Sequence, residues 1–274
     1  NKRFLKESFG AYISPDLIDQ MFDEKQEPKL GGDPGYHTMM FSDIASFSTF
    51  SEKLEAESLL KLLNEYLTAM TDILINNKGT LDKYIGDAIV AFYGAPAPLV
   101  DQEKKACSTA LMMHNKLDEL RKKWMKEDDW PDIVYQMQHR IGLNSGQMVT
   151  GNMGSEMRMN YTMMGDTVNL AARLEPAAKQ YGVYILVGEK VYKASNDEFV
   201  FRFLDFLSVK GKNIPVKTYE LIDRKELINK SSIELINTFE EGLDNYFNQK
   251  WEQAIKLFKK STNFEDNFPG RNTN

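Results

Sequence analysis

Residues 79–96 read GTLDKYIGDAIVAFYGAP, and this stretch is the most informative about the fold of the chain. Two short runs rich in β-branched and aromatic residues flank Gly86-Asp87, a pattern that predicts a β-hairpin with its turn near Gly86. The hairpin carries a cation, Lys83, four positions before an anion, Asp87. These two side chains could pair with each other, or each could contact a different group of a ligand.

Strand and helix patterns alternate on both sides of this hairpin. The apolar run YHTMMFSDI predicts a buried strand that ends at Asp43, and two amphipathic helices are expected over residues 56–79 and 101–124. Residues 137–153 predict a second hairpin, turning around Ser145-Gly146. A further helix and several strands are expected over residues 167–182, 183–193, 199–211 and 216–222. Such alternation predicts a mixed, largely antiparallel sheet with helices packed on it.

The two ends of the chain have different patterns from the middle. Residues 1–35 predict a helical linker that Gly31, Gly32 and Pro34 bring to an end before the main domain at 36–222. Residues 223–274 predict a helical hairpin with its turn near Asn248-Gln249, similar to one tetratricopeptide-like unit. Its expected apolar stripe is Phe239, Leu243, Tyr246, Trp251, Ala254, Ile255 and Phe258. The hairpin either packs on the main domain or binds a protein partner.

Composition excludes some classes of protein. The 274 residues carry a net charge of −6, whereas a broad nucleic-acid surface is basic, so no nucleic-acid partner is expected. The single cysteine, Cys107, is expected to be buried and fits a reducing, cytoplasmic compartment. No apolar run is long enough for a membrane span. The chain begins with Asn rather than Met, and we therefore interpret it as a fragment of a longer protein.

Two groups of polar residues could carry chemistry. Asp43 and Asp87 are expected at adjacent strand ends, where paired carboxylates can hold Mg²⁺, although an aspartate taken alone is more often a turn or cap residue. Asn169 and Arg173 lie four positions apart on an expected helix and therefore share a face. A guanidinium group suits phosphate oxygens, but Arg173 could also pair with Glu175 on a solvated face.

Four motifs occur together in one order along the chain, at residues 39–52, 79–96, 140–154 and 161–175. Jointly they resemble the catalytic domain of class III nucleotidyl cyclases over about residues 36–222. That resemblance implies an α+β fold with a ferredoxin-like βαββαβ core and a mixed, mostly antiparallel sheet. The flanking segments resemble bacterial members with an upstream CHASE2 sensor, which implies a full-length protein anchored in a membrane.

The resemblance assigns roles to individual residues. Asp43 and Asp87 match the two metal-binding aspartates, with the Ile44 carbonyl as a further ligand of two Mg²⁺ or Mn²⁺ ions per site. Asn169 matches the residue that orients the ribose, and Arg173 the one that stabilises the reacting α-phosphate. Two further phosphate contacts are expected, from Lys210 and Arg158.

Lys83 and Thr162 match the two base-recognising positions of the family. Adenine presents an acceptor at N1, which suits the donor-only Lys83, and a donor at N6, which the Thr162 hydroxyl can accept. Guanine reverses this pattern, so the site is expected to prefer ATP over GTP. Threonine at position 162 resembles the Thr-type subclass, class IIIb, which includes bicarbonate-responsive cyclases.

The activity implied is adenylate cyclase: the ribose 3′-OH of ATP attacks the α-phosphorus in line, giving 3′,5′-cyclic AMP and pyrophosphate. Positioning and charge stabilisation supply most of the catalysis in such reactions. None of the histidines, His37, His114 and His139, lies in a matching motif, so each is expected to be structural or exposed. The family's sites lie between two catalytic domains, which implies a homodimer. The alternatives are a guanylate cyclase, an inactive cyclase-like signalling or binding module, and an interaction protein built on the C-terminal helices.

Overall fold

The computed structural model describes residues 29–208 and 215–265, so residues 1–28 of the expected linker and Lys210 lie outside the described residues. Its centre is one eight-stranded sheet, in which seven strands follow the order β2-β3-β1-β4-β6-β8-β7 and β5 pairs with β4. The strands are β1 (Gly31–Ile44), β2 (Thr80–Ile85), β3 (Ala88–Tyr93), β4 (His139–Ser155), β5 (Arg158–Met164), β6 (Ile185–Gly188), β7 (Phe199–Leu207) and β8 (Val216–Arg224).

The expected α+β class with a ferredoxin-like core is confirmed. Along the chain the core runs β1-α4-β2-β3-α5-β4, and its strands lie side by side in the order β2-β3-β1-β4. The sheet is mostly antiparallel, and the β4–β6 pair is parallel. The helices are α3 (Phe47–Lys53), α4 (Ala56–Asn76), α5 (Gln102–Glu127), α6 (Asp132–Tyr135), α7 (Asp166–Tyr181), α8 (Glu189–Ser195), α9 (Lys230–Phe247) and α10 (Trp251–Glu265).

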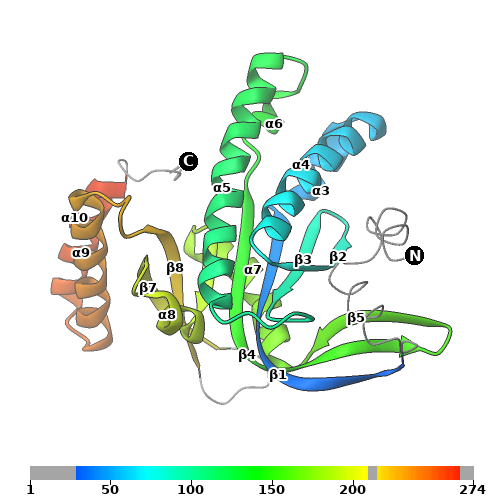
Figure 1. Cartoon of the computed structure of the whole chain (residues 1–274). Coiled ribbons are helices and arrows are strands. Elements are labelled where there is room, and N and C mark those ends of the chain that lie inside the picture. Colours follow the sequence, from blue (N-terminus) through cyan, green and yellow to red (C-terminus); the bar gives the residue numbers. More distant parts are fainter. Residues whose placement is uncertain (1–28, 209–214, 266–274) are drawn as a thin grey trace.

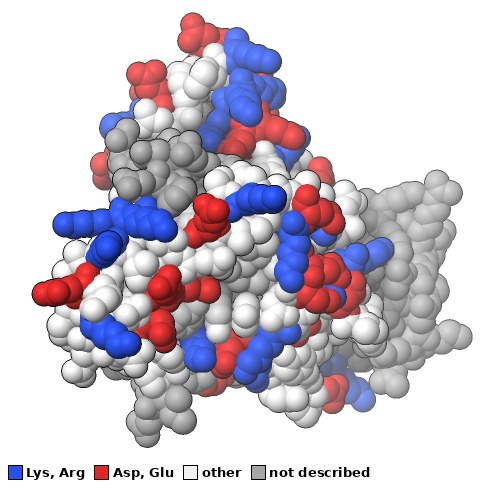
Figure 2. All heavy atoms as spheres, turned by 90° about the vertical axis from the view of Figure 1, so that its left-hand side faces the viewer, with Lys and Arg blue, Asp and Glu red and all other residues white. Residues whose placement is uncertain are grey.

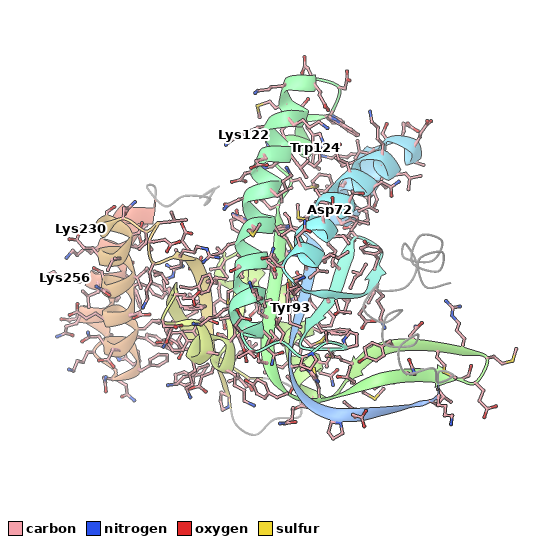
Figure 3. All side chains as sticks on the ribbon, in the orientation of Figure 1. Asp72, Tyr93, Lys122, Trp124, Lys230 and Lys256 are labelled. Carbon is pink, nitrogen blue, oxygen red and sulfur yellow. The ribbon has the colours of Figure 1, made fainter. Side chains whose placement is uncertain are left out.

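Each face of the sheet has its own apolar core. On one face, α4 and α5 bury side chains such as Met70 and Cys107 against the strands, and the two helices extend well beyond the sheet (Figure 1). Trp124 of α5 is fully buried, and its Nε1 donates to Glu65 of α4 across 3.0 Å (Figure 3). On the other face, α7 and β5 cover a smaller cluster that includes Met39 and Phe92. The sheet is therefore sandwiched at its centre.

The first hairpin forms as its sequence predicts, with β2 and β3 joined through Gly86, whose φ of +64° suits glycine. The second expected hairpin is wrong. Ser145 and Gly146 lie inside the continuous strand β4, paired with Thr38 and His37 of β1. Gly146 is needed for a close approach, because a Cβ there would lie 2.8 Å from the Thr167 hydroxyl at the start of α7. The turn comes instead between Ser155 and Arg158, where β4 leads into β5.

The first strand begins at Gly31, inside the segment expected to be linker, and ends at Ile44. Its early part pairs with β4 alone, because its pairing with β3 starts only at Thr38. Pro34 is tolerated there, since a proline without an amide hydrogen fits a stretch that has a neighbour on one side only. Likewise β8 continues to Arg224, so the expected boundaries at residues 36 and 222 both fall within strands.

The C-terminal hairpin of α9 and α10 packs against β7. Glu240 of α9 accepts a hydrogen bond from the Phe203 amide across 2.8 Å, and the Arg202 guanidinium lies over the Phe239 ring. Of the expected apolar stripe, Ala254 is buried, whereas three members are about half exposed: Tyr246, Trp251 and Ile255. Figure 2 views this side of the molecule and shows acidic and basic side chains interspersed on it, without a broad basic area on that face.

In the described parts of the chain, no helix has the length and apolar character needed to cross a membrane. Cys107 is buried, as expected, and forms no disulfide.

A buried hydrogen bond links the first core face to β4. The Tyr66 hydroxyl lies 3.0 Å from His139 Nδ1, and both side chains are fully buried. Burial first, and then the nearby His114 and Arg121, hold the pKa of His139 well below its usual value. His139 is thus structural and neutral in the folded chain.

This histidine makes the fold sensitive to acid. Below about pH 6.5 the unfolded chain binds a proton at residue 139 that the folded chain does not bind, so acidification favours unfolding. We expect this group alone to lower the free energy of unfolding by about 2 kcal/mol between pH 7 and pH 5. Urea unfolding at pH 7 and at pH 5 measures this change in the free energy of unfolding. His139→Gln, which keeps an amide for Tyr66, should lose that increment, and an unchanged pH dependence in the variant would refute the assignment.

Candidate functional site

The two candidate metal aspartates meet where β1 and the β2–β3 turn lie side by side. Pairing of Ser42 with Ile89 aligns the end of β1 with the start of β3, and the Ile44 amide donates to Asp87 Oδ2 across 3.0 Å. Burial first, and then the adjoining carboxyl group of Asp43, raise the pKa of Asp87 to about 7. The structure therefore brings Asp43 and Asp87 together, which the sequence alone could not establish.

This pair fits a divalent cation. Two carboxyl groups in contact resist ionising together, and a cation placed between them would remove that repulsion. Within residues 29–208 and 215–262, no group of three or more His, Cys, Asp or Glu side chains is arranged to hold a metal ion. Mg²⁺ commonly takes only one or two carboxylates from a protein, and leaves its other positions for water and phosphate. The role of the Ile44 carbonyl as a further ligand stays a prediction.

The two candidate base-recognising residues also meet. Lys83 of β2 donates to the Thr162 hydroxyl of β5 across 3.4 Å. Its neighbour Tyr84 is hydrogen-bonded to Thr71 of α4, so Lys83 points to the opposite face of the sheet, on the side covered by β5. The ion pair that Lys83 forms is with Asp82, across 3.3 Å, while Asp87 contacts Asp43 and Ile44. The cation and anion of the hairpin thus belong to different groups.

Asp82 is the residue that sequence reasoning missed. The Thr162 hydroxyl donates to its Oδ2 across 2.5 Å, and its side chain is only 4% exposed. In a regular strand, neighbouring side chains point to opposite faces, so the sequence places Asp82 away from Lys83. A register irregularity between Leu81 and Lys83 brings both to one side. The only signal in the sequence was an acid directly beside the candidate lysine.

The third group lies on α7. Asn169 and Arg173 are both exposed and, four residues apart, share one face of the helix as predicted. The start of α7 is held in place because the Asn144 amide donates to the Thr167 carbonyl across 2.9 Å. Glu175, offered by the sequence as a partner for Arg173, accepts a hydrogen bond from Arg140 across 3.0 Å.

The remaining candidate sites have less support. Arg158 opens β5 beside the turn from β4, where its backbone amide donates to Ser155 and its side chain is exposed. Its contact with a phosphate stays a prediction. Lys210 lies outside the described residues.

Residues 35–223 match a family model described as the adenylate and guanylate cyclase catalytic domain. The chain is 28% identical to "Adenylate cyclase 1" of Rhizobium meliloti over 81% of this chain and 33% of that protein. It is 32% identical to "Adenylate cyclase" of Anabaena cylindrica over 80% of this chain and 42% of that protein. The chain thus spans less than half the length of these curated relatives.

The chain is also similar to solved structures of cyclases. The adenylyl cyclase CyaB from P. aeruginosa is 34% identical with a TM-score of 0.65, covering 73% of this chain and 100% of that one. The guanylyl cyclase Cya2 is 30% identical with a TM-score of 0.62, covering 73% of this chain and 98% of that one. An adenylyl and a guanylyl cyclase are therefore both similar to this chain, so similarity in fold does not distinguish ATP from GTP as the substrate.

Proposed function

The chain belongs to the family of adenylate and guanylate cyclase catalytic domains, and we propose that it is an adenylate cyclase, which converts ATP to 3′,5′-cyclic AMP and pyrophosphate. The main support for ATP as the substrate is the contact between Lys83 and Thr162. Together they offer a donor for adenine N1 and an acceptor for adenine N6, the reverse of what guanine needs. A guanine site would want a carboxylate where Lys83 stands.

Each group of residues has one task in the proposed reaction. Asp43 and Asp87 would hold two Mg²⁺ or Mn²⁺ ions, which when bound supply charge neutralisation for the triphosphate and make the ribose hydroxyl more acidic. Asn169 orients the ribose, so that its 3′-oxygen faces the α-phosphorus opposite the leaving pyrophosphate. Arg173 donates to the α-phosphate oxygens as charge builds there. A new bond forms from O3′ to the α-phosphorus, the bond to pyrophosphate breaks, and the hydroxyl proton leaves to solvent.

We further propose that the working unit is a homodimer with its sites at the interface. One chain supplies Asp43 and Asp87 to a site, and the partner chain supplies Lys83, Thr162, Asn169 and Arg173. Exposed apolar side chains on the segment where β4 pairs with β5, residues 149–164, support a partner there. Val149, Met157 and Met164 are 38%, 96% and 61% exposed. A two-fold dimer would cover them and complete two equivalent sites.

The function is tested by incubating the purified chain with ATP or GTP, first with Mn²⁺ and then with Mg²⁺. We expect cyclic AMP to form, with kcat/KM for ATP exceeding that for GTP by about a hundredfold. Specific activity should rise with protein concentration and then level off, because dilution separates the half-sites. Cyclic GMP as the main product would show a guanylate cyclase. No product at any concentration or with either metal would indicate an inactive cyclase-like module.

The C-terminal hairpin is proposed to act outside the reaction. Its contacts with β7 involve Phe203 and Arg202, which belong to none of the three candidate groups. The exposed Tyr246, Trp251 and Ile255 offer an apolar surface for a protein partner. An upstream membrane-anchored sensor, implied by the flanking sequences, likewise stays a proposal.

A further inference from the structure

We propose that Asp82 determines base specificity by positioning: its carboxylate takes the proton of the Thr162 hydroxyl in a hydrogen bond and so leaves that oxygen able only to accept from the nucleotide base. This inference rests on the proposed function, because it assumes that the base lies beside Lys83 and Thr162.

The geometry places Asp82 beneath both recognition residues. One carboxylate oxygen, Oδ2, accepts from Thr162 across 2.5 Å, and the other, Oδ1, lies 3.3 Å from the Lys83 ammonium. The Asp82 side chain is 4% exposed, whereas that of Lys83 is 39% exposed. Asp82 is thus too deeply placed to read the base directly, and the two residues above it are placed to do so.

A count of donors and acceptors shows what remains for the base. A threonine hydroxyl has one proton and two lone pairs. In this structure the proton points to Asp82, and one lone pair faces Lys83 across 3.4 Å. Only the second lone pair is left, so Thr162 can accept from adenine N6 but cannot donate to guanine O6. Without Asp82 the hydroxyl could rotate and serve either base.

Two contacts stabilise the ionised form of Asp82 against the effect of burial. Burial raises the pKa of Asp82, while the hydrogen bond from Thr162 and the charge of Lys83 oppose that rise. Both contacts therefore favour the form of Asp82 that carries no proton of its own to donate.

The test measures binding, so it does not depend on turnover. Dissociation constants of 3′-deoxy-ATP and 3′-deoxy-GTP, which lack the attacking hydroxyl, are measured by calorimetry with Mn²⁺ on the whole chain. The wild-type chain should favour the adenine nucleotide. Asp82→Asn has almost the same shape but only one oxygen, so it cannot keep both contacts, and the preference for adenine should fall about tenfold or more.

A second variant tests the same hydrogen bond from its other side, and a control variant tests whether the effect is specific to it. Thr162→Val removes the hydroxyl with little change of shape, and should lower the preference by a similar factor. In the double variant the two effects should combine to less than their product, because both act through one hydrogen bond. Asp129→Asn, at an exposed aspartate beyond α5, should leave the preference unchanged within about twofold.

The outcomes separate the inference from the function on which it rests. A folded Asp82→Asn chain with wild-type preference overturns the inference, as does a wild-type chain without preference for adenine. If Asp82→Asn does not fold, Thr162→Val decides, and an unchanged preference in it overturns the inference too. A chain that favours adenine through Asp82 yet makes no cyclic AMP would support the inference and refute only the proposed reaction.

Discussion

Replacing Asp43 by Asn should reduce the rate of cyclic AMP formation by about a thousandfold or more. The pair of Asp43 and Asp87 is proposed to hold both ions, and an amide in place of one carboxylate removes a full negative charge from that site. Because the ions would serve both the attacking oxygen and the triphosphate, their loss affects turnover as well as binding. Initial rates with saturating Mn²⁺ measure the effect.

The same substitution should not weaken the fold. The contact between Asp43 and Asp87 costs stability, as the pKa of Asp87, raised to about 7, indicates. Asn at position 43 relieves that repulsion, so the free energy of unfolding at pH 7 should stay equal or rise by up to about 1 kcal/mol. Asp72→Asn, at an exposed aspartate of helix α4 (Figure 3), is the matched control and should retain wild-type rates. Activity of Asp43→Asn within tenfold of wild type would exclude the proposed metal site.

Replacing Arg173 by Ala should lower kcat by about a hundredfold or more and change KM for ATP much less. The guanidinium is proposed to contact oxygens that gain charge mainly in the transition state, and loss of such a contact acts on turnover rather than on binding. Arg173→Lys keeps the charge without the planar fork and should recover part of the loss. Steady-state kinetics of the three chains measure these effects.

Lys179 provides the matched control for Arg173. It is an exposed cation on the same helix, in the last turn of α7. Lys179→Ala should therefore leave kcat near the wild-type value. Should Arg173→Ala instead raise KM with kcat unchanged, Arg173 would be a binding residue and its proposed role would be wrong.

The parts of the fold that sequence predicted well are those governed by local patterns. The helix α4 shows an apolar residue every third or fourth position, and the turn at Gly86 needs a positive φ. The family resemblance then predicted the βαββαβ core correctly, although the local pattern alone predicted only a mixed, largely antiparallel sheet. Long-range pairing explains the errors. Ser145 and Gly146 look like a turn in isolation, but they are held in β4 because β1 runs beside them for its full length.

The candidate site was likewise predicted from the sequence only in part. The sequence identified Asp43, Asp87, Lys83 and Thr162, and the structure adds which of them touch. Asp82 could not be found, because it depends on an irregularity in β2 that the residue pattern does not reveal. The catalytic roles of all these residues stay predictions. So does the division of the chain at residues 36 and 222 into functional units.

One active site is proposed to be built from two chains, and this arrangement can be tested by mixing two inactive variants. Asp43→Ala and Lys83→Ala chains should each be nearly inactive, because every site in either homodimer lacks one essential residue. In a one-to-one mixture, half of the dimers pair the two variants, and each of these contains one intact site. We expect the mixture to recover about a quarter of wild-type activity. A mixture no more active than either variant alone, under conditions where the chains exchange, would show that the site is not shared between two chains.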